Sequence, residues 1–381
     1  MVDDVDARAD EALNRFLPPD IVPGVPRTHH VTGLVLSRDG ELWLARTLAA
    51  IEAQVRPVDE VVGIDAGSSD DSAQILSEAF STTVLVRPEA EGAGGEPAGG
   101  MARALAAGVA ATASGAAGTA SAAPDEGAVA WYWILHDESA PEPACLEALL
   151  MGADRNPNAG ILVPKTVAWS DSGRLVGVGN RWAPGSPVVD PLDAKERDQG
   201  QYDVDRPVYT GDSAGMLVRA DLWHALDGMD PAVGDWAGPA DLCRRVWGSG
   251  SEVFFIPTAV LAHRQAGHRG ARPGQAGSAH PRRAAREGQL TLELTQAPVW
   301  ALGWRYLRAW LSTAARMLAL LLTREPEEAT AEVAGSWRVL GHPGRLHRAR
   351  RRLRRAPVTD LRRPPHVRAR RGVTFTHSLD S

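Results

Sequence analysis

In the N-terminal part of the chain, short apolar runs typical of strands alternate with segments whose apolar residues recur at the spacing of a helix. The runs Val31–Ser37 and Thr82–Arg87 are short and largely apolar, as buried strands are, and Glu60–Ser72 opens with a third such run. Between them, Glu41–Gln54 repeats its apolar residues at helical spacing, and SAQILSEAF continues Glu60–Ser72 as a helix. Strands alternating with helices predict a parallel, doubly wound α/β sheet.

The same pattern resumes after an insertion, residues 89–128, that is dominated by Ala and Gly. Within this insertion MARALAAGVAAT is suited to a helix, and SGAAGTASAAPDEG is expected to be a loop. The apolar run WYWIL predicts a fourth strand and GILVPK a fifth. PADLCRRVWGSG is typical of a helix that ends at Gly, and Ser251–His263 predicts the final strand.

Shifts in composition divide the chain into five parts. The leader is rich in Asp and Pro, and Gly, Arg and Pro dominate the segment that follows the last predicted strand. The five parts are a flexible leader in 1–29, an α/β domain in 30–265, a linker in 266–290, membrane-interface helices in 291–341 and an Arg-rich tail in 342–381.

The segment Ala297–Thr323 is the most hydrophobic predicted helix. Its length could span a bilayer, but Arg305, Arg308 and Arg316 would each be costly inside one. On a helical wheel the three arginines fall within an arc of roughly 80°, opposite most of the Trp and Leu residues. This favours a helix in the headgroup region, with Trp at the interface and Arg toward phosphates. A helix packed against the soluble domain is the alternative.

Charge is distributed unevenly. The formal net charge is −6, but residues 342–381 contain twelve Arg and two Asp, which leaves −16 for the rest of the chain. A basic tail after an amphipathic helix favours attachment to anionic lipid, although a solvated basic segment is the simplest alternative. No nucleic-acid partner is expected, because neither aromatic interleaving nor an RNA-binding motif accompanies the arginines.

The two cysteines and the N-terminus bear on the compartment. Cys145 and Cys243 are too few for a disulfide framework and too isolated for a zinc site, which indicates a reducing compartment. The first residues, MVDDVDARAD, lack the apolar core of a secretory signal. We therefore expect a location at the cytoplasmic face of the membrane.

Candidate chemistry begins where the fourth predicted strand ends, at His136-Asp137-Glu138. Ligands of open α/β sheets bind at the carboxyl ends of the strands, and adjacent carboxylates there can hold Mg²⁺ or Mn²⁺. Asp65 ends the second strand and is expected at the same edge, where it could accept a hydrogen bond from a base or ribose. Gly67 lets the following turn approach a ligand closely. The alternatives are a turn acid at Asp65 and a helix cap at Asp137 and Glu138.

Four segments together resemble the family 2 glycosyltransferases, which have the GT-A fold. The first is VTGLVLSRDG through EVVGIDAGSSDDS, which is similar to the opening that builds the nucleotide half of the site. WILHDESAPEP resembles the DXD-type metal motif in the HDDSAPEP form of an actinobacterial branch, and SAGMLVRADLWHALDGMDP resembles the acceptor-side segment. VLAHRQ places His263 where many members carry a metal- or diphosphate-contacting His. The resemblance covers roughly residues 31–263.

The resemblance implies a division of roles among these residues. The nucleotide would contact Ser37, Asp65, Gly67 and Asp137, and the divalent cation, Mg²⁺ or Mn²⁺, would be held by Asp137, Glu138 and His263. Glu138 replaces an Asp that is common at this point of the motif. His263 taken alone is more often a satisfied surface or core histidine.

The catalytic base departs from the family pattern. Members usually carry an acidic pair in a D-D-x-D-L or E-D-x-D-L segment, but this chain reads GDWAGPADLCRRV, with Gly238 and Pro239 in place of the pair. Asp241 matches the last acid of the pattern. Asp235 lies three residues before Gly238 and is the candidate that a local loop shift could bring into position.

These features lead to three functional hypotheses. The first is an inverting, metal-assisted glycosyltransferase that uses a nucleotide-sugar donor and a cell-envelope polysaccharide or lipid-linked acceptor. The second is a catalytically impaired nucleotide-binding or scaffold protein of the same fold, which the missing acidic pair favours. A nucleotidyltransferase is disfavoured, because SRDGELW is a poor match to a Gly-rich phosphate loop.

Overall fold

The computed structural model describes residues 28–86, 100–113, 127–183, 186–265 and 281–355. Most of its strands form one ten-stranded sheet. The N-terminal half of this sheet is parallel, in the order β3-β2-β1-β4. These strands are β1 (His29–Ser37), β2 (Glu60–Asp65), β3 (Thr82–Leu85) and β4 (Val129–His136). The predicted α/β class is therefore confirmed.

The second half of the sheet is mixed. Strand β11 lies between β4 and β6 and is antiparallel to both, whereas β6 and β12 are parallel to each other. Short antiparallel partners extend this half, and β8 with β9 forms a separate two-stranded sheet. The strands are β5 (Ser139–Pro141), β6 (Ala159–Ala168), β7 (Asp171–Gly177), β8 (Arg181–Ala183), β9 (Ser186–Val189), β10 (Arg206–Pro207), β11 (Leu217–Arg219) and β12 (Glu252–His263).

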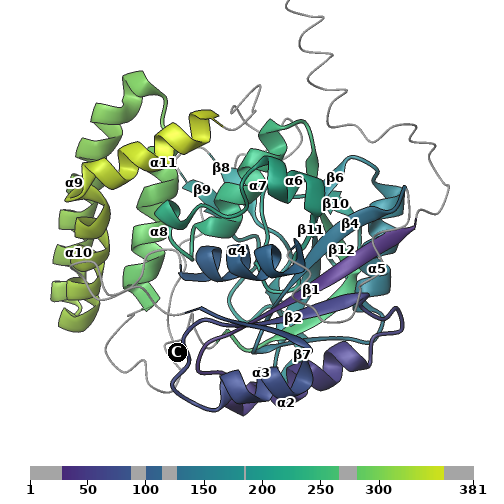
Figure 1. The fold of residues 1–381 in the computed structure, drawn as a ribbon. Helices are drawn as coiled ribbons and strands as arrows, with labels where there is room; N and C mark the ends of the chain where they lie inside the picture. Colours follow the sequence, from purple (N-terminus) through teal and green to yellow (C-terminus); the bar gives the residue numbers. More distant parts are fainter. Residues whose placement is uncertain (1–27, 87–99, 114–126, 184–185, 266–280, 356–381) are drawn as a thin grey trace, which may run out of the picture.

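Helices cover both faces of the sheet (Figure 1). Strand β4 shows why: Trp131, Trp133 and Leu135 pack into the core on one face, and Tyr132 and Ile134 into the core on the other. Successive side chains of a strand point to opposite faces, so a run of apolar residues needs a helix layer on each side. One layer contains α2 (Glu41–Glu52), α3 (Ser72–Ala79) and α5 (Cys145–Arg155), and the other α4 (Gly100–Ala113), α6 (Ala220–Ala225) and α7 (Gly238–Gly248).

Four further helices lie together beside the α/β domain (Figure 1). They are α8 (Pro281–Thr295), α9 (Val299–Leu322), α10 (Pro326–Leu340) and α11 (Pro343–Arg355). Two sequence expectations differ from this arrangement. The segment expected as a linker, 266–290, is helical from Pro281 onward, because α8 packs against α10 and the α/β domain. The first part of the Arg-rich tail is the helix α11, and residues 356–381 lie outside the described part.

A buried ion pair joins three of these helices. Arg286 of α8 and Glu332 of α10 are 4% and 1% exposed, and Arg286 Nε lies 2.9 Å from Glu332 Oε1. Arg286 also donates to Thr313 Oγ1 of α9 at 3.1 Å and to Ser336 Oγ of α10 at 3.1 Å. A buried guanidinium without these acceptors would be strongly destabilising, so the contacts fix how the helices pack.

The arginines of α9 have partners on α8 and α10 that the sequence did not predict. Arg308 and Arg316 reach the carboxylates of Glu293 and Glu332 at 3.1 and 3.8 Å, and Arg305 donates to the carbonyl of Glu293. The arginine side of the helix therefore faces acidic partners on α8 and α10, while the side chains of Arg308 and Arg316 remain 44% and 52% exposed. Among the described helices, none is sufficiently long and apolar to cross a bilayer.

The C-terminal helices contact the α/β domain next to a 3₁₀ turn, η1 (Pro231–Val233). Val233 and Ala237 pack with Leu292 of α8 and Ala349 of α11 in one apolar cluster. Gly288 of α8 lies against the Trp236 ring, so closely that a Cβ there would be 2.3 Å from a ring carbon. These helices therefore support the loop that carries Asp235.

Candidate functional site

The ends of three neighbouring parallel strands bring the predicted residues to one edge of the sheet. Ser37 of β1 pairs in register with Asp65 of β2, and Leu36 pairs with His136 at the end of β4. Asp137 therefore follows β4 beside Ser37. The structure brings together Ser37, Asp65 and Asp137 at the carboxyl edge, where ligands of α/β sheets bind.

Asp137 organises the loop after β1. Its side chain is fully buried, and Oδ2 accepts hydrogen bonds from Ser37 Oγ at 3.0 Å and from the Arg38 amide at 2.9 Å. Its backbone carbonyl accepts a bond from Thr47 Oγ1 of α2 at 2.7 Å. Gly40 leaves room for the carboxylate, since a Cβ at Gly40 would lie 2.1 Å from Oδ2. One acid thus fixes both the loop and the start of α2.

Asp65 organises the turn after β2. Its Oδ2 accepts hydrogen bonds from the amides of Gly67 and Ser68, both at 3.1 Å, and its Oδ1 accepts one from Ser68 Oγ. Gly67 has a φ of 83°, a conformation that L-residues rarely adopt. The structure thus gives Asp65 the turn-forming role that sequence analysis left as its alternative, and a nucleotide contact is a further prediction for it.

Asp39, which sequence analysis did not select, connects these two loops. Its Oδ1 accepts bonds from the Ser69 amide at 2.8 Å and the Ser69 hydroxyl at 2.9 Å, and its own amide donates to Ser68 Oγ at 2.9 Å. Asp39 has a φ of 52°, in the left-handed region that Asp tolerates better than most residues. The Asp-Gly dipeptide in SRDG is the turn signal that could have identified it.

A second group of residues gathers around His263 at the end of β12. Strand β5 pairs with β12 so that His263 lies opposite Ser139, which brings Glu138 alongside it. His263 Nε2 lies 3.7 Å from Glu138 Oε1, and Nδ1 lies 3.5 Å from Asp212 Oδ2. The side chains of Glu138 and His263 are buried, whereas that of Asp212 is 26% exposed. Asp212, from the GDSAG turn, is another member, and it was not among the residues assigned to the metal from the sequence.

The two histidines of this region have opposite electrostatic environments. Burial lowers the pKa of His263, but the neighbouring Asp212 and Glu138 raise it to about 9, above the ordinary 6.5. Burial and the nearby His263 lower the pKa of His136 to about 4. The two rings are 5.6 Å apart, and His136 Nε2 is within hydrogen-bond distance, 3.1 Å, of Ser213 Oγ. His263 is therefore the cation of the group and His136 its neutral partner.

The side chains around His263 are of the kinds that bind a divalent cation, but they are not arranged around a common point. In the described part of the chain, no three His, Cys, Asp or Glu side chains are arranged to hold a metal ion. Both buried nitrogens of His263 lack a hydrogen-bond partner, because the nearest carboxylate oxygens lie beyond hydrogen-bond distance. Carboxylates and imidazole are the ligands Mn²⁺ takes, so Glu138, Asp212 and His263 fit the ion by chemistry.

Asp235 contacts the start of α4. The side chain of Met101 lies between it and the residues around His263 and His136. It is exposed, and its Oδ1 accepts a hydrogen bond from the Met101 amide at 2.9 Å. The Met101 sulfur is 3.7 Å from Ser213 Oγ, and Ser213 contacts His136. The residue proposed from sequence as the base therefore supports the helix that borders the site.

Asp241 is occupied elsewhere, which corrects its assignment as a catalytic residue. It is 2% exposed, and its Oδ2 accepts a hydrogen bond from Arg245 Nε at 2.8 Å. Arg245 also donates to the carbonyls of Leu226 and Gly228. The carboxylate thus neutralises a buried guanidinium that closes the preceding loop. Gly238 begins α7 and, like Pro239, is buried, so no acid stands at this point.

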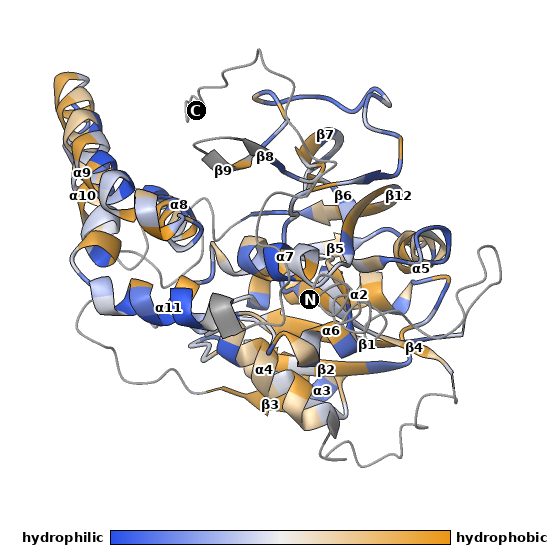
Figure 2. Ribbon diagram, turned by 90° about the horizontal axis from the view of Figure 1, so that it is seen from above, coloured by the Kyte–Doolittle hydropathy of each residue, from blue (hydrophilic) through white to orange (hydrophobic). Residues whose placement is uncertain are grey.

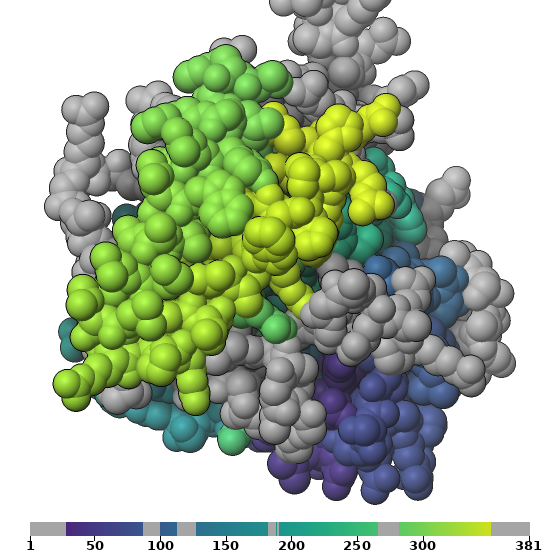
Figure 3. Space-filling view, turned by 90° about the vertical axis from the view of Figure 1, so that its left-hand side faces the viewer, coloured from purple at the N-terminus to yellow at the C-terminus, as the bar shows by residue number. Residues whose placement is uncertain are grey.

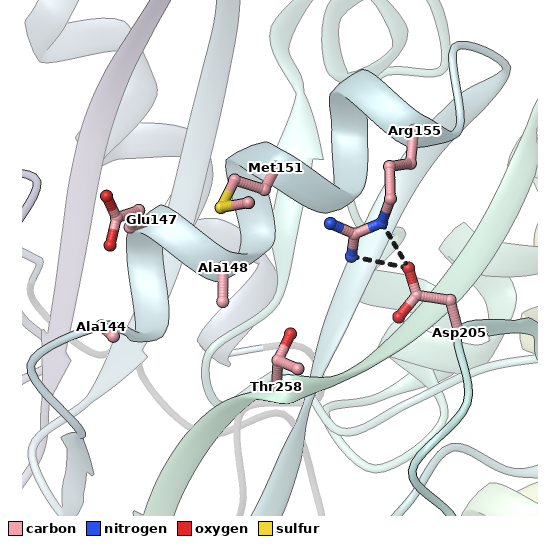
Figure 4. A pocket seen from close by; sticks show the side chains of 7 residues that line it. All are labelled: Ala144, Glu147, Ala148, Met151, Arg155, Asp205 and Thr258. Atoms are coloured by element: carbon pink, nitrogen blue, oxygen red, sulfur yellow. Dashed lines mark hydrogen bonds and ion pairs between the residues drawn. The ribbon is translucent and has the colours of Figure 1, made fainter. Parts of the chain in front are cut away.

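A hollow of about 510 Å³ lies away from these residues, between α5 and β12 (Figure 4). Two nitrogens of Arg155 donate to Asp205 Oδ2 there, at 2.9 and 2.7 Å. Its lining residues are Ala144, Glu147, Ala148, Met151, Arg155, Asp205 and Thr258. None of them is a candidate site residue, so the hollow does not contribute to the site.

Solved structures similar to this chain include two with bound nucleotide. GalNAc-T7 with UDP, GalNAc and Mn²⁺ matches with a TM-score of 0.46 and 14% identity, over 70% of this chain and about half, 48%, of its own length. S. aureus TarS 1-349 in complex with UDP-GlcNAc matches with a TM-score of 0.45 and 14% identity, over 86% of this chain and 89% of TarS. No protein-family model and no curated protein matches the sequence. Because both TM-scores lie below 0.5, the functional assignment rests on the geometry of the site.

We predict that Gly40→Ala disturbs the site without unfolding the protein. The new methyl group must displace the Asp137 carboxylate, which we expect to lower the free energy of unfolding by about 1–3 kcal/mol in urea titrations. Gly303→Ala is the matched control. That position in α9 has nothing within 4 Å of a new Cβ, so stability should rise by up to about 1 kcal/mol. Equal effects at both positions would contradict the packing of Gly40 on Asp137.

We also predict that His263 makes the stability depend on pH. Its folded-state pKa of about 9 exceeds the ordinary 6.5, so the folded protein holds a proton that the unfolded chain releases. This stabilisation is complete below pH 6.5 and is lost as the pH rises through 9, by up to about 3 kcal/mol. Urea unfolding between these pH values, with a chelator present, should show the decline. His263→Gln should remove it, and an unchanged slope in that variant would refute the assignment.

Proposed function

We propose that the chain is a glycosyltransferase that moves a sugar from a nucleotide-sugar donor to an acceptor hydroxyl. The observation that carries this proposal is the cluster of buried acids at the carboxyl edge of the parallel sheet. Burying carboxylates is costly for a fold, and such groups gather where a charged ligand must be handled. Asp137, Glu138 and Asp65 all follow or end strands at this edge.

The nucleotide half of the proposed site is formed by the loops after β1 and β2. Asp137 holds the first loop and Asp65 the second, and Asp39 ties the two together. Because these contacts are made within the protein, the loops are preorganised and little conformational entropy is lost when a ligand binds. We assign Ser37, Asp65, Gly67 and Asp137 to this half.

The diphosphate half would lie near Glu138 and His263. When bound there, Mg²⁺ or Mn²⁺ supplies positive charge for the departing nucleoside diphosphate. Asp137, Glu138, Asp212 and His263 are the residues that would hold it. To serve as a ligand His263 would first have to release the proton that it holds beside Glu138 and Asp212, because only the neutral imidazole coordinates a metal.

Inversion at the anomeric carbon requires a base that takes the proton of the attacking hydroxyl. Asp235 is exposed and is linked through Met101 to the Ser213 and His136 contact. We propose it as this base. We further propose a cell-envelope polysaccharide or lipid-linked glycan as the acceptor, and the cytoplasmic face of the membrane as the place of action.

A nucleotide-binding scaffold without transferase activity is the second candidate. It is favoured by one observation: Gly238 and Pro239 form the buried start of α7, and Asp241 is neutralised by Arg245. If Asp235 only supports α4 through Met101 and is not the base, the described part of α7 supplies no accessible carboxylate to take the proton of the acceptor hydroxyl.

We predict that one nucleoside diphosphate raises the melting temperature in a metal-dependent manner. UDP, GDP and TDP should each be tested with and without Mn²⁺, and a ligand at a hundredfold its Kd stabilises the native state by about 2.7 kcal/mol. Asp137→Ala and Asp65→Ala should abolish the shift, and Leu42→Ser, at an exposed position of α2, should retain it. No shift with any nucleotide would overturn the donor site. A shift without slow, Mn²⁺-dependent donor hydrolysis would favour the scaffold.

We predict that two variants of Asp235 separate the base from a supporting role. Asn keeps an oxygen that can accept the Met101 amide hydrogen bond, whereas Ala removes it. If Asp235 is the base, both Asp235→Asn and Asp235→Ala should lower kcat at least about a hundredfold, with little change in KM. Near-normal activity in Asp235→Asn, with loss only in Asp235→Ala, would contradict the base and indicate a role in positioning α4.

A further inference from the structure

One side of α9, which we call the outer face, is apolar and exposed. Trp300, at 89%, and Leu322, at 75%, are the most exposed of its residues. The outer face comprises Val299, Trp300, Trp304, Leu307, Trp310, Leu311, Met317, Leu318, Leu321 and Leu322. Contiguous exposed apolar surface of this kind on a soluble fold marks an interaction site.

The opposite side of α9 explains why the apolar residues are left outside. Ala301, Ala309, Thr313 and Leu320 are buried against the neighbouring helices, and small residues there allow close packing. The three arginines lie toward this side and contact Glu293 or Glu332. The helix is thus held by its polar side, and the sequence of α9 contains no acidic residue that would repel an anionic partner.

Aromatic and basic side chains lie beside part of the outer face, and the exposed acids Glu325 and Glu327 follow its C-terminal end. Trp337 of α10 is 58% exposed, and its ring stacks edge-to-face on Trp310 with 6.2 Å between centroids. On α11, Arg348 and Arg351 are exposed. Figure 3 shows α9, α10 and α11 side by side on one face of the molecule, and in Figure 2 α11 is largely hydrophilic.

We propose that the outer face of α9 docks the protein onto a lipid bilayer that contains anionic headgroups. Trp favours the boundary between headgroups and acyl chains, and a 24-residue amphipathic helix can lie in that boundary. The arginines of α11 complement anionic headgroups. This assignment goes beyond the proposed sugar transfer and uses the Trp- and Leu-rich side of α9, which the sequence pattern already placed at the membrane interface.

The test is co-sedimentation of the full chain with vesicles of phosphatidylcholine, with and without phosphatidylglycerol. We expect binding to the anionic vesicles, weakened by salt and by the double variant Arg348→Gln/Arg351→Gln. Trp300→Ser/Trp304→Ser should lower the partition coefficient at least about tenfold, since two exposed aromatic side chains no longer insert. Both positions are exposed, so the fold should be unaffected.

The matched control is Leu42→Ser/Val204→Ser, which removes two apolar side chains that are each 70% exposed elsewhere on the surface. It should bind vesicles like the unaltered protein. Equal binding by the Trp300→Ser/Trp304→Ser variant, or an equal loss in the control, would overturn the proposal. The proposal would also be overturned if the unaltered protein did not bind vesicles but formed a dimer in sedimentation velocity, and if the Trp300→Ser/Trp304→Ser variant abolished that dimer. The nucleotide thermal shift, measured on the same variants, separates failure of docking from failure of the donor site.

Discussion

The proposed site depends on the buried carboxylate of Asp137, which accepts two hydrogen bonds. A carboxylate without water needs donors, and Ser37 and the Arg38 amide supply them. To reach these donors the loop after β1 must fold over the end of β4, and only Gly leaves space at position 40. The loop in turn offers Asp39 to the turn after β2. Geometry at the sheet edge therefore follows from satisfying one charge.

Charge satisfaction also shapes the rest of the molecule. Arg245 and Asp241 close the loop before α7, Arg286 and Glu332 join the C-terminal helices, and His263 lies between two acids. The Arg245–Asp241 pair is hydrogen-bonded, and the Arg286–Glu332 pair lies at 2.9 Å. Around His263 the distances are longer and both nitrogens are unsatisfied. His263 is thus a buried titratable group beside two acids, which is the kind of group that often marks a ligand site.

The sequence predicted the sheet and its edge because their signals are local. WYWIL alternates between two cores, and strand ends carry acids. It could not predict Asp212 or Asp39, whose importance depends on which loops meet in space. The wheel of α9 correctly separated arginines from tryptophans but assigned the arginines to lipid, because the acids that attract them lie on α8 and α10. Asp241 matched a motif, yet its partner Arg245, one turn later, decides its role.

The contact between Trp236 and Gly288 has a consequence for how the protein unfolds. Val233, Ala237, Leu292 and Ala349 form a cluster to which both the α/β domain and the C-terminal helices contribute. Removing α8–α11 would expose this cluster to water, so we expect their loss to destabilise the α/β domain. The helices therefore stabilise the α/β domain as well as one another.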